Sequence, residues 1–300
     1  MKKIFSSLLA LLAGGVFAQD APLKVLMVGN SFSLSCKTYL RQVAASAKCG
    51  LELEIAYIGG CSLERHVREY EASQSDPAHR PYRTIDNRPS SLQELLGKKK
   101  WDIISIQQAS HLSWRADSYH PWAEKLIGII READPQAEIV IQETWSYNGG
   151  DHRFAALTPD WSVDQTTMFE ELDKNYRKLA KDNNFRIVPV GVAVQLTRED
   201  KPLQLPTCDE KFIRSFTYPD PLPETTDVVG QCGWGKKRNP GVDTIHLNLY
   251  GQYLQACVWC GFLFGKPVAD IAFYPPELDR ERVEKLRVFA QKALDLEKIR

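Results

Sequence analysis

Short apolar runs alternate with longer amphipathic stretches along most of the chain. The run at 23–28 is almost continuously apolar and ends at Gly29, a pattern typical of a strand that is covered on both faces. Further strands of this kind are expected at 51–58, 101–106, 137–141 and 185–190. Helices are expected at 38–47, 91–96, 122–133, 163–183, 249–264 and 278–296. Because strands separated by helices form parallel βαβ units, the pattern predicts a three-layer α/β/α sandwich around a five-stranded parallel sheet.

The alternation of strands and helices is interrupted between residues 199 and 242. Proline and glycine recur in this stretch, and it has no clear apolar pattern from which to build a core of its own. We therefore expect an irregular insertion within one domain that spans 19–300, rather than a second domain.

The first 18 residues predict a secretory signal peptide. A basic Met-Lys-Lys start precedes an apolar stretch at 4–17, and Val-Phe-Ala at 16–18 resembles a small-x-small cleavage site. The apolar stretch is too short to span a bilayer; the alternative interpretation is a buried first helix. We expect cleavage near Ala18 and a mature protein that is exported to the periplasm or the extracellular space, without insertion into a membrane.

Charge is balanced along the chain, with 38 basic and 38 acidic side chains and a formal net charge of zero. A balanced chain has no overall attraction to nucleic acid or to an anionic membrane surface, so neither partner is expected. Cationic runs at 98–100 and 236–238 are short, and we interpret them as solvated loop charges. No protein partner can be inferred from the sequence.

Seven cysteines in an exported chain make disulfides possible, and the odd number leaves at least one of them unpaired within the monomer. Cys208 and Cys232 bracket a loop-rich segment and are the favoured pair. Cys257 and Cys260 have the spacing of a redox motif, but they lie within an apolar helical pattern, so we expect them to pack in the core.

Polar or glycine-bearing segments directly follow the predicted strands. They lie at 29–31, 59–62, 107–108 and 143–145, with a further glycine at 191. In open parallel sheets, ligands bind beyond the carboxyl ends of the strands, so we expect these segments to face one rim. The pattern therefore predicts a site assembled from distant parts of the chain.

Two polar motifs carry candidate hydrolytic chemistry. Ser31 follows Gly29 where a strand turns into a helix, and His246 follows Asp243 by three residues. A serine hydroxyl needs a base within hydrogen-bond reach and a third group that orients the base. Each motif also has a plainer interpretation, because a serine here can be a helix cap and a histidine here can lie on the surface near a helix start.

Together the Gly-Asn-Ser-Phe segment at 29–32, the Gly-Gly turn at 59–60 and the Asp-x-x-His motif at 243–246 resemble the SGNH (GDSL-like) hydrolase superfamily. The likeness extends from residue 23 to about 265 and is greatest to an exported bacterial branch of otherwise unknown function. The resemblance implies a flavodoxin-like sandwich and a serine esterase mechanism. It also implies Ser31 as nucleophile, His246 as base and Asp243 as the acid that orients the base, with the N–H groups of Ser31 and Gly60 in the oxyanion hole.

One block departs from the superfamily pattern. Where the superfamily has Gly-x-Asn after the third strand, with the Asn side chain donating to the oxyanion, this chain has Gln-Gln-Ala-Ser-His at 107–111. Gln108 is the expected substitute donor and His111 is a second candidate. Loss of one oxyanion donor costs about 100- to 1000-fold in rate, so either a substitute is present or the enzyme is slow. Gln107, His111 and Trp145 are expected to contact the substrate.

These features predict an exported serine esterase that removes acetyl or similar small acyl groups, with an acylated carbohydrate as the substrate. Aromatic residues in the predicted loops are suited to stacking on sugar rings, although they can equally pack beneath long loops. No metal, P-loop or dinucleotide motif is present, so no metal or cofactor is expected. Two alternatives are a catalytically silent glycan-binding protein on the same fold, and a lysophospholipase or thioesterase.

Overall fold

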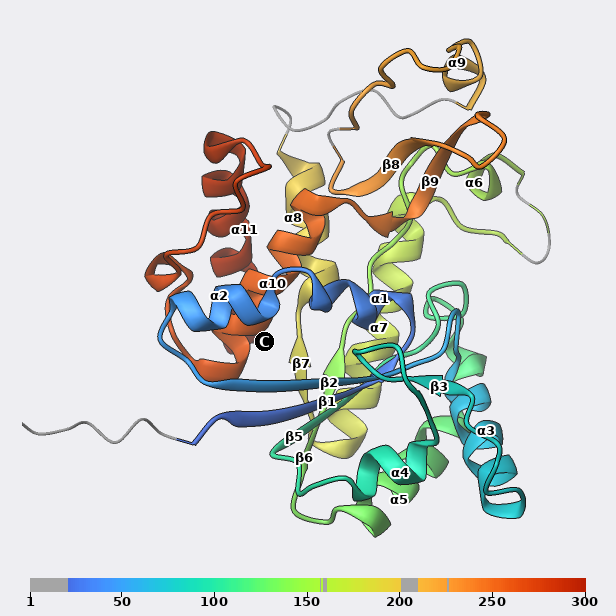
Figure 1. Cartoon of the computed structure of the whole chain (residues 1–300), viewed down its shortest axis with the longest axis vertical. Coiled ribbons are helices and arrows are strands. Elements are labelled where there is room, and N and C mark those ends of the chain that lie inside the picture. The colour runs from blue at the N-terminus through green and yellow to red at the C-terminus, as the bar shows by residue number, and fades with distance from the viewer. Residues whose placement is uncertain (1–20, 157, 159–160, 201–209, 226) are drawn as a thin grey trace, which may run out of the picture.

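The computed structural model describes residues 21–156, 158, 161–200, 210–225 and 227–300 (Figure 1). The predicted signal peptide at 1–18 lies outside the described residues, and so does Cys208 of the predicted disulfide. None of the helices in the described part of the chain is long and apolar enough to cross a membrane.

The core of the molecule is one mostly parallel sheet. Its five parallel strands are β1 (Leu23–Gly29), β2 (Leu51–Tyr57), β5 (Ile103–Ile106), β6 (Glu138–Gln142) and β7 (Arg186–Val188), in the spatial order β2-β1-β5-β6-β7. Residues 25–28 of β1 are fully buried, as their apolar pattern predicts. The central strands are therefore covered on both faces.

Two short antiparallel strands, β3 (Tyr82–Arg83) and β4 (Pro89–Ser90), extend the sheet beyond β2. The sheet consequently has seven strands rather than the five that were predicted. A two-residue strand is too short to show an alternating pattern, so the sequence contains no periodic signal for either of them.

Helices cover both faces of the sheet, which confirms the predicted α/β/α sandwich (Figure 1). One group of helices that pack against one another consists of α2 (Leu40–Ser46), α8 (Val190–Glu199), α10 (Leu249–Phe264) and α11 (Arg280–Ile299). A second group packs together from α3 (Leu63–Ser75), α4 (Leu92–Gly97) and α5 (Trp122–Ala133), and α7 (Gln165–Asn183) joins β6 to β7. The sequence did not predict α8, whose first turn contains Gly191 instead of a strand end.

A two-stranded hairpin stands apart from the central sheet. Its strands are β8 (Val229–Trp234) and β9 (Pro240–Leu247), and α9 (Glu210–Ile213) contacts it. In Figure 1 the hairpin lies at the top of the molecule, near α6 (His152–Ala156). Part of the stretch predicted to be irregular thus forms regular structure, and β9 carries the Asp-x-x-His motif.

The CxxC pair lies inside α10, where both thiols are buried. Cys257 and Cys260 form no disulfide, and burial raises the pKa of each thiol to about 12. A thiol with so high a pKa is a poor nucleophile, so both side chains act as small apolar packing groups.

Candidate active site

Ser31 lies at the turn from β1 into the short helix α1 (Ser31–Leu34). Asn30 caps this helix, since its side-chain oxygen accepts a hydrogen bond from the N–H of Phe32 at 3.0 Å. A side chain on Gly29 would come within 2.3 Å of the Ser33 hydroxyl, so the turn needs glycine there. The serine therefore stands at the carboxyl end of the central strand.

A network of buried amides lies beneath the serine turn. Gln107 donates from Nε2 to the Asn30 side-chain oxygen at 2.7 Å, and its own Oε1 accepts from the Ser33 hydroxyl at 2.8 Å. Gln142 donates to the same Oε1 at 2.5 Å and accepts from the Trp259 indole at 2.9 Å. The network joins the carboxyl ends of β1, β5 and β6, so the position of the serine turn is coupled to the packing of the sheet.

His246 comes to Ser31 from the hairpin. Its Nε2 lies 2.9 Å from the Ser31 Oγ, and its Nδ1 lies 2.8 Å from Oδ2 of Asp243. The tautomer that satisfies both contacts has the proton on Nδ1, which donates to the carboxylate, while Nε2 accepts from the serine hydroxyl. The structure thus brings together the three residues that the sequence predicts as a triad.

Asp243 is held as a carboxylate. Its burial raises the pKa, but hydrogen bonds from the His246 ring and from the backbone N–H groups of His246 and Ile245 outweigh burial and lower the pKa to about 2. A group that accepts three hydrogen bonds in its charged form stays ionised near neutral pH. A fixed negative charge next to Nδ1 stabilises the imidazolium that forms when Nε2 takes a proton.

Trp145 connects the serine turn to the hairpin. Its ring stacks on that of Phe32, with ring centres 3.8 Å apart, and its indole N–H donates to the Ile245 carbonyl at 2.9 Å. The side chain is fully buried. Beside the substrate contact predicted for it, Trp145 thus has a structural role, because its hydrogen bond fixes the residue directly before His246.

A second connection holds β9 at Thr244. The Thr244 carbonyl accepts from the backbone N–H of Asn148 at 2.8 Å, and the Thr244 hydroxyl donates to buried Asp151 at 2.6 Å. Arg153 donates to the same Asp151 carboxylate at 2.7 and 2.6 Å. The sequence did not point to Asn148 or Asp151, because their partner Thr244 lies more than 90 residues further along the chain. The one available signal was the polar Asn-Gly-Gly-Asp turn after the fourth predicted strand.

Two backbone N–H groups are available near the serine. Among the described residues, the N–H groups of Ser31 and Gly60 donate to no protein acceptor. Gly60 has a φ of +60°, which favours glycine, and the Asn30 side chain donates to the Cys61 carbonyl at 3.0 Å and so joins this turn to the serine turn. Both N–H groups fit the oxyanion-hole role that the resemblance implies.

Gln108 does not fit the role predicted for it. Its Oε1 accepts from the N–H of Leu63 at 3.0 Å, and its Nε2 donates to the carbonyl and hydroxyl of Ser118 at 2.9 and 3.2 Å. Both amide hydrogens are therefore used in connecting loops, and neither is free for an oxyanion. His111 lies in the exposed turn that follows β5 and does not border the pocket of Ser31. Gln107 belongs to the buried network and not to a substrate surface.

A pocket of about 460 Å³ opens at the triad, and we call it the serine pocket. It is lined by Ser31, Leu34, Ser35, Lys37, Thr38, Trp145, His246, Leu247 and Gln252. Leu34, Trp145 and Leu247 give it an apolar wall, while Thr38 and Gln252 add polar atoms. A pocket of this size accommodates a small organic group beside the serine hydroxyl.

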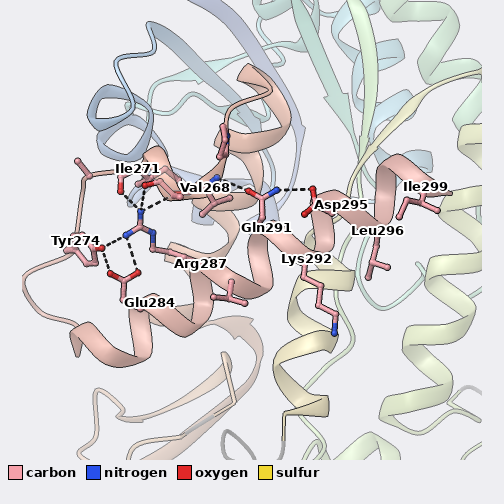
Figure 2. Close-up of a pocket in the computed structure, with 14 residues that line it drawn as sticks. Val268, Ile271, Tyr274, Glu284, Arg287, Gln291, Lys292, Asp295, Leu296 and Ile299 are labelled. Atoms are coloured by element: carbon pink, nitrogen blue, oxygen red, sulfur yellow. Dashed lines mark hydrogen bonds and ion pairs between the residues drawn. The ribbon is translucent and has the colours of Figure 1, made fainter.

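A larger hollow of about 1050 Å³ lies on a different part of the molecule, between α11 and the segment around the 3-10 helix Val268–Asp270 (Figure 2). Its most buried charged group, Arg287, donates to the carbonyls of Val268 and Ala269 and so serves packing. No serine, cysteine or histidine lines this hollow. Volume alone therefore does not identify the candidate active site; the hydrogen-bonded triad does.

Comparison with known proteins shows the family of the chain and proteins of similar fold. A model of DUF4886, a domain of unknown function, matches residues 24–212, a range that ends before Asp243. A DUF4886 family protein from Bacteroides uniformis ATCC 8492 is 26% identical, with a TM-score of 0.70 over 91% of this chain and 95% of that chain. No curated protein matches the chain in sequence.

Hydrolases of the predicted superfamily are also among the similar solved structures. A candidate SGNH hydrolase from Slackia heliotrinireducens is 17% identical, with a TM-score of 0.49 over 81% of this chain and 100% of that chain. An acetyl xylan esterase is 14% identical, with a TM-score of 0.47 over 81% of this chain and 100% of that chain. Since the family model spans well over half of its residues, the chain belongs to the DUF4886 family.

Proposed function

We propose that this protein is a serine esterase that hydrolyses small acyl esters. The observation that carries the proposal is the unbroken hydrogen-bonded series from the Ser31 hydroxyl through His246 to the ionised Asp243, at 2.9 and 2.8 Å. These are the groups and distances that activate a serine hydroxyl.

The geometry supports a two-step reaction. The Ser31 oxygen attacks the ester carbonyl while His246 Nε2 takes the hydroxyl proton, and the N–H groups of Ser31 and Gly60 donate to the resulting oxyanion. The imidazolium then gives its proton to the departing alkoxide, which leaves an acyl-serine and a free alcohol. In the second step, water attacks the acyl-serine while His246 Nε2 takes its proton. The imidazolium then returns a proton to the Ser31 oxygen, and the carboxylic acid is released.

The proposed oxyanion hole has two backbone donors, and Gln108 adds no side-chain donor to it, because both of its amide hydrogens are engaged elsewhere. One missing donor costs about 100- to 1000-fold in rate. We therefore expect a slow esterase with a low kcat, rather than an inactive protein.

The serine pocket supports a small acyl group such as acetyl. Its apolar wall lies beside the serine hydroxyl, where the acyl chain of the intermediate has to fit. An exported enzyme acting on an acylated carbohydrate remains the proposed setting, on the basis of the leader at 1–18 and the loop aromatics.

The decisive experiment is the hydrolysis of a simple aryl acetate by the Ser31→Ala variant. We expect kcat/KM to fall at least about 1000-fold, as for loss of a triad nucleophile, with an unchanged melting temperature. Ser75→Ala removes an equivalent hydroxyl from α3, away from the site, and should match the wild type. Retained hydrolysis in Ser31→Ala would refute the proposal.

A second candidate function is a glycan-binding protein without catalysis, favoured by the incomplete oxyanion hole. An organophosphonate that reacts with activated serines separates the two. Covalent labelling of the wild type at Ser31, absent from Ser31→Ala, is expected for the esterase. Glycan binding without labelling is expected for the binding protein.

A further inference from the structure

A second hollow meets the serine pocket at His246. It has a volume of about 810 Å³ and follows the outer side of the β8–β9 hairpin. Its lining consists of His152, Arg153, Gln231, Gly233, Trp234, Gly235 and residues 239–246. Among the described residues, His246 is the one that borders both this hairpin hollow and the serine pocket.

The side chains of the hairpin hollow are suited to a sugar. Trp234 offers an aromatic face, and its ring is supported edge to face by Tyr218 with centres 5.4 Å apart. Gln231 and Asn239 are exposed amides that both donate and accept hydrogen bonds, which matches the dual character of sugar hydroxyls. The serine pocket, by contrast, has an apolar wall at the nucleophile. The two hollows therefore favour chemically different parts of one substrate.

A fixed guanidinium forms part of the wall. Arg153 donates from Nε and Nη2 to Asp151, and it lies over the Tyr147 ring at 4.3 Å. Asp151 also accepts from the Thr244 hydroxyl at 2.6 Å, so this wall and the strand that carries His246 are one connected unit. A ligand held at the hollow is thus held at a defined distance from the base.

Positive charge gathers at the rim. Lys236, Lys237 and Arg238 form the turn between β8 and β9, all three are exposed, and none makes an ion pair with a described residue. Gly235 and Asn239, which line the hollow, flank the run on both sides and close the turn by a hydrogen bond of 2.8 Å. The carboxylates of the hollow wall are occupied by internal partners.

The proton transfers indicate where the alcohol part of the ester lies. His246 Nε2 must protonate the departing alkoxide, so the alcohol oxygen lies next to His246. Because the acyl group occupies the serine pocket, the rest of the alcohol extends into the hairpin hollow, which also borders His246. We propose that the hairpin hollow binds the alcohol part of the ester and that this alcohol is a negatively charged saccharide. The inference rests on the proposed esterase function, and it assigns the 236–238 run a function beyond that of solvated loop charges.

The test compares acetylated oligosaccharides of equal length, one neutral, one bearing carboxylates and one bearing sulfates, with an aryl acetate as reference. We define the anionic ratio as kcat/KM for an anionic oligosaccharide divided by kcat/KM for the aryl acetate. For the wild type at low salt, we expect this ratio to be higher than the corresponding ratio for the neutral oligosaccharide and to fall as salt rises. In the variant carrying Lys236→Gln, Lys237→Gln and Arg238→Gln, the anionic ratio should fall about tenfold. A preference for either anion supports the proposal, and a preference for neither overturns it.

A charge-matched control isolates the rim. Lys125→Gln, Lys181→Gln and Lys292→Gln remove three exposed cations from α5, α7 and α11 and should leave the anionic ratio at the wild-type value. An equal fall in both triple variants would assign the effect to net charge and overturn the proposal. Trp234→Ala should lower the ratios for neutral and anionic oligosaccharides alike, about tenfold, because it removes the stacking face.

Binding separates this inference from the esterase proposal. Calorimetry with Ser31→Ala protein measures binding at the hollow without turnover, with the carboxylated and the sulfated oligosaccharide in turn. If the wild type hydrolyses no ester but either oligosaccharide binds, and binding is lost with the rim cations, the saccharide site stands and the esterase proposal fails. If esters are hydrolysed but neither oligosaccharide binds, the esterase stands and the saccharide site fails.

Discussion

The two halves of the candidate active site are built in different ways. Ser31 lies at the end of a central strand, above amides of Asn30, Gln107 and Gln142 that are 2% exposed or less. His246 and Asp243 lie on a hairpin outside the main sheet, and their side chains are 42% and 32% exposed. The position of the proposed nucleophile is therefore coupled to the stability of the fold, whereas the position of the proposed base depends on a few polar contacts.

This difference predicts separable effects of mutation. The serine half consists of Ser31 and the buried amides of Asn30, Gln107 and Gln142 beneath it. Loss of one of these amides should lower stability together with activity, because the amides hold both the sheet and the serine turn. The hairpin half consists of His246 and Asp243 on β9. Substitutions in this half should lower activity with little change in stability, because β9 contacts the core through few residues.

The largest effect is expected from Asp243→Asn, which replaces the carboxylate that accepts from His246 Nδ1 by a neutral amide. An amide cannot hold Nδ1–H as a carboxylate does, so His246 loses its orientation and the stabilisation of its imidazolium. We expect kcat to fall about 10⁴-fold at pH 7 with a small change in melting temperature. Asp270→Asn, which changes an exposed carboxylate far from the site, is the control. Asp243→Asn activity within tenfold of the wild type would contradict the triad.

Gln107→Leu tests the serine half. It leaves the Ser33 hydroxyl and the Gln142 Nε2 without a partner in the core, and the Asn30 oxygen keeps only the bond from the Phe32 N–H. We expect the free energy of unfolding to fall by about 1–3 kcal/mol, measured by urea denaturation, and kcat to fall with it.

Ser105→Ala is the matched control for Gln107→Leu, since it changes the same strand. The Ser105 hydroxyl is buried and has no hydrogen-bond partner among the described residues, so its loss should be neutral or stabilising. If Gln107→Leu lowered activity without lowering stability, the proposed coupling of the nucleophile to the core would be wrong.

Trp145→Phe tests the connection between the halves. The substitution keeps a ring against Phe32 and removes the hydrogen bond to the Ile245 carbonyl. We expect a loss of about 1 kcal/mol in stability and a fall in kcat of up to about tenfold. Trp101→Phe removes an equally buried indole bond, to Leu95, away from the site. It should cost similar stability without changing kcat; equal kcat losses would argue against a positioning role for Trp145.

The smallest effect concerns pH. Because the folded state lowers the pKa of Asp243 from 3.8 to about 2, this carboxylate stabilises the fold above about pH 3.8, and its contribution is lost as pH falls toward 2. The difference in unfolding free energy between the wild type and Asp243→Asn should therefore shrink between pH 5 and pH 2. A difference that is constant over this range would show that Asp243 is not held as a carboxylate.

Two long helices were predicted with the bounds that the structure has. α5 presents an apolar face to the core with helical spacing, and α10 is mostly apolar, with residues 253–261 all buried. The helix α3 was missed since most of its residues are polar and its buried positions include His66 and Ser73. The strands β3 and β4 were missed because two residues show no period. The pattern of apolar residues therefore predicts a helix or strand only where burial is continuous or follows a regular spacing.

At the candidate site, the sequence predicted the three residues that the structure brings together, Ser31, His246 and Asp243, but not the contacts that support them. Gln108 was predicted as an oxyanion donor from its position after a strand, but its partners come from Leu63 and Ser118, which no local pattern connects to it. Asp151 was missed for the same reason. Hydrogen-bond partners of a buried amide or carboxylate depend on which loops meet in space.

The sequence by itself determined the five parallel strands and the helical layers beside them, the rim at which polar segments gather, and the chemical types of serine, histidine and aspartate. Tertiary structure alone decided that Ser31 and His246, 215 residues apart, lie within hydrogen-bond distance, and that the hairpin brings a second hollow to the same histidine. The physical reason is that apolar spacing acts within one element, whereas contacts between a central strand and a peripheral hairpin arise from the packing of the whole chain.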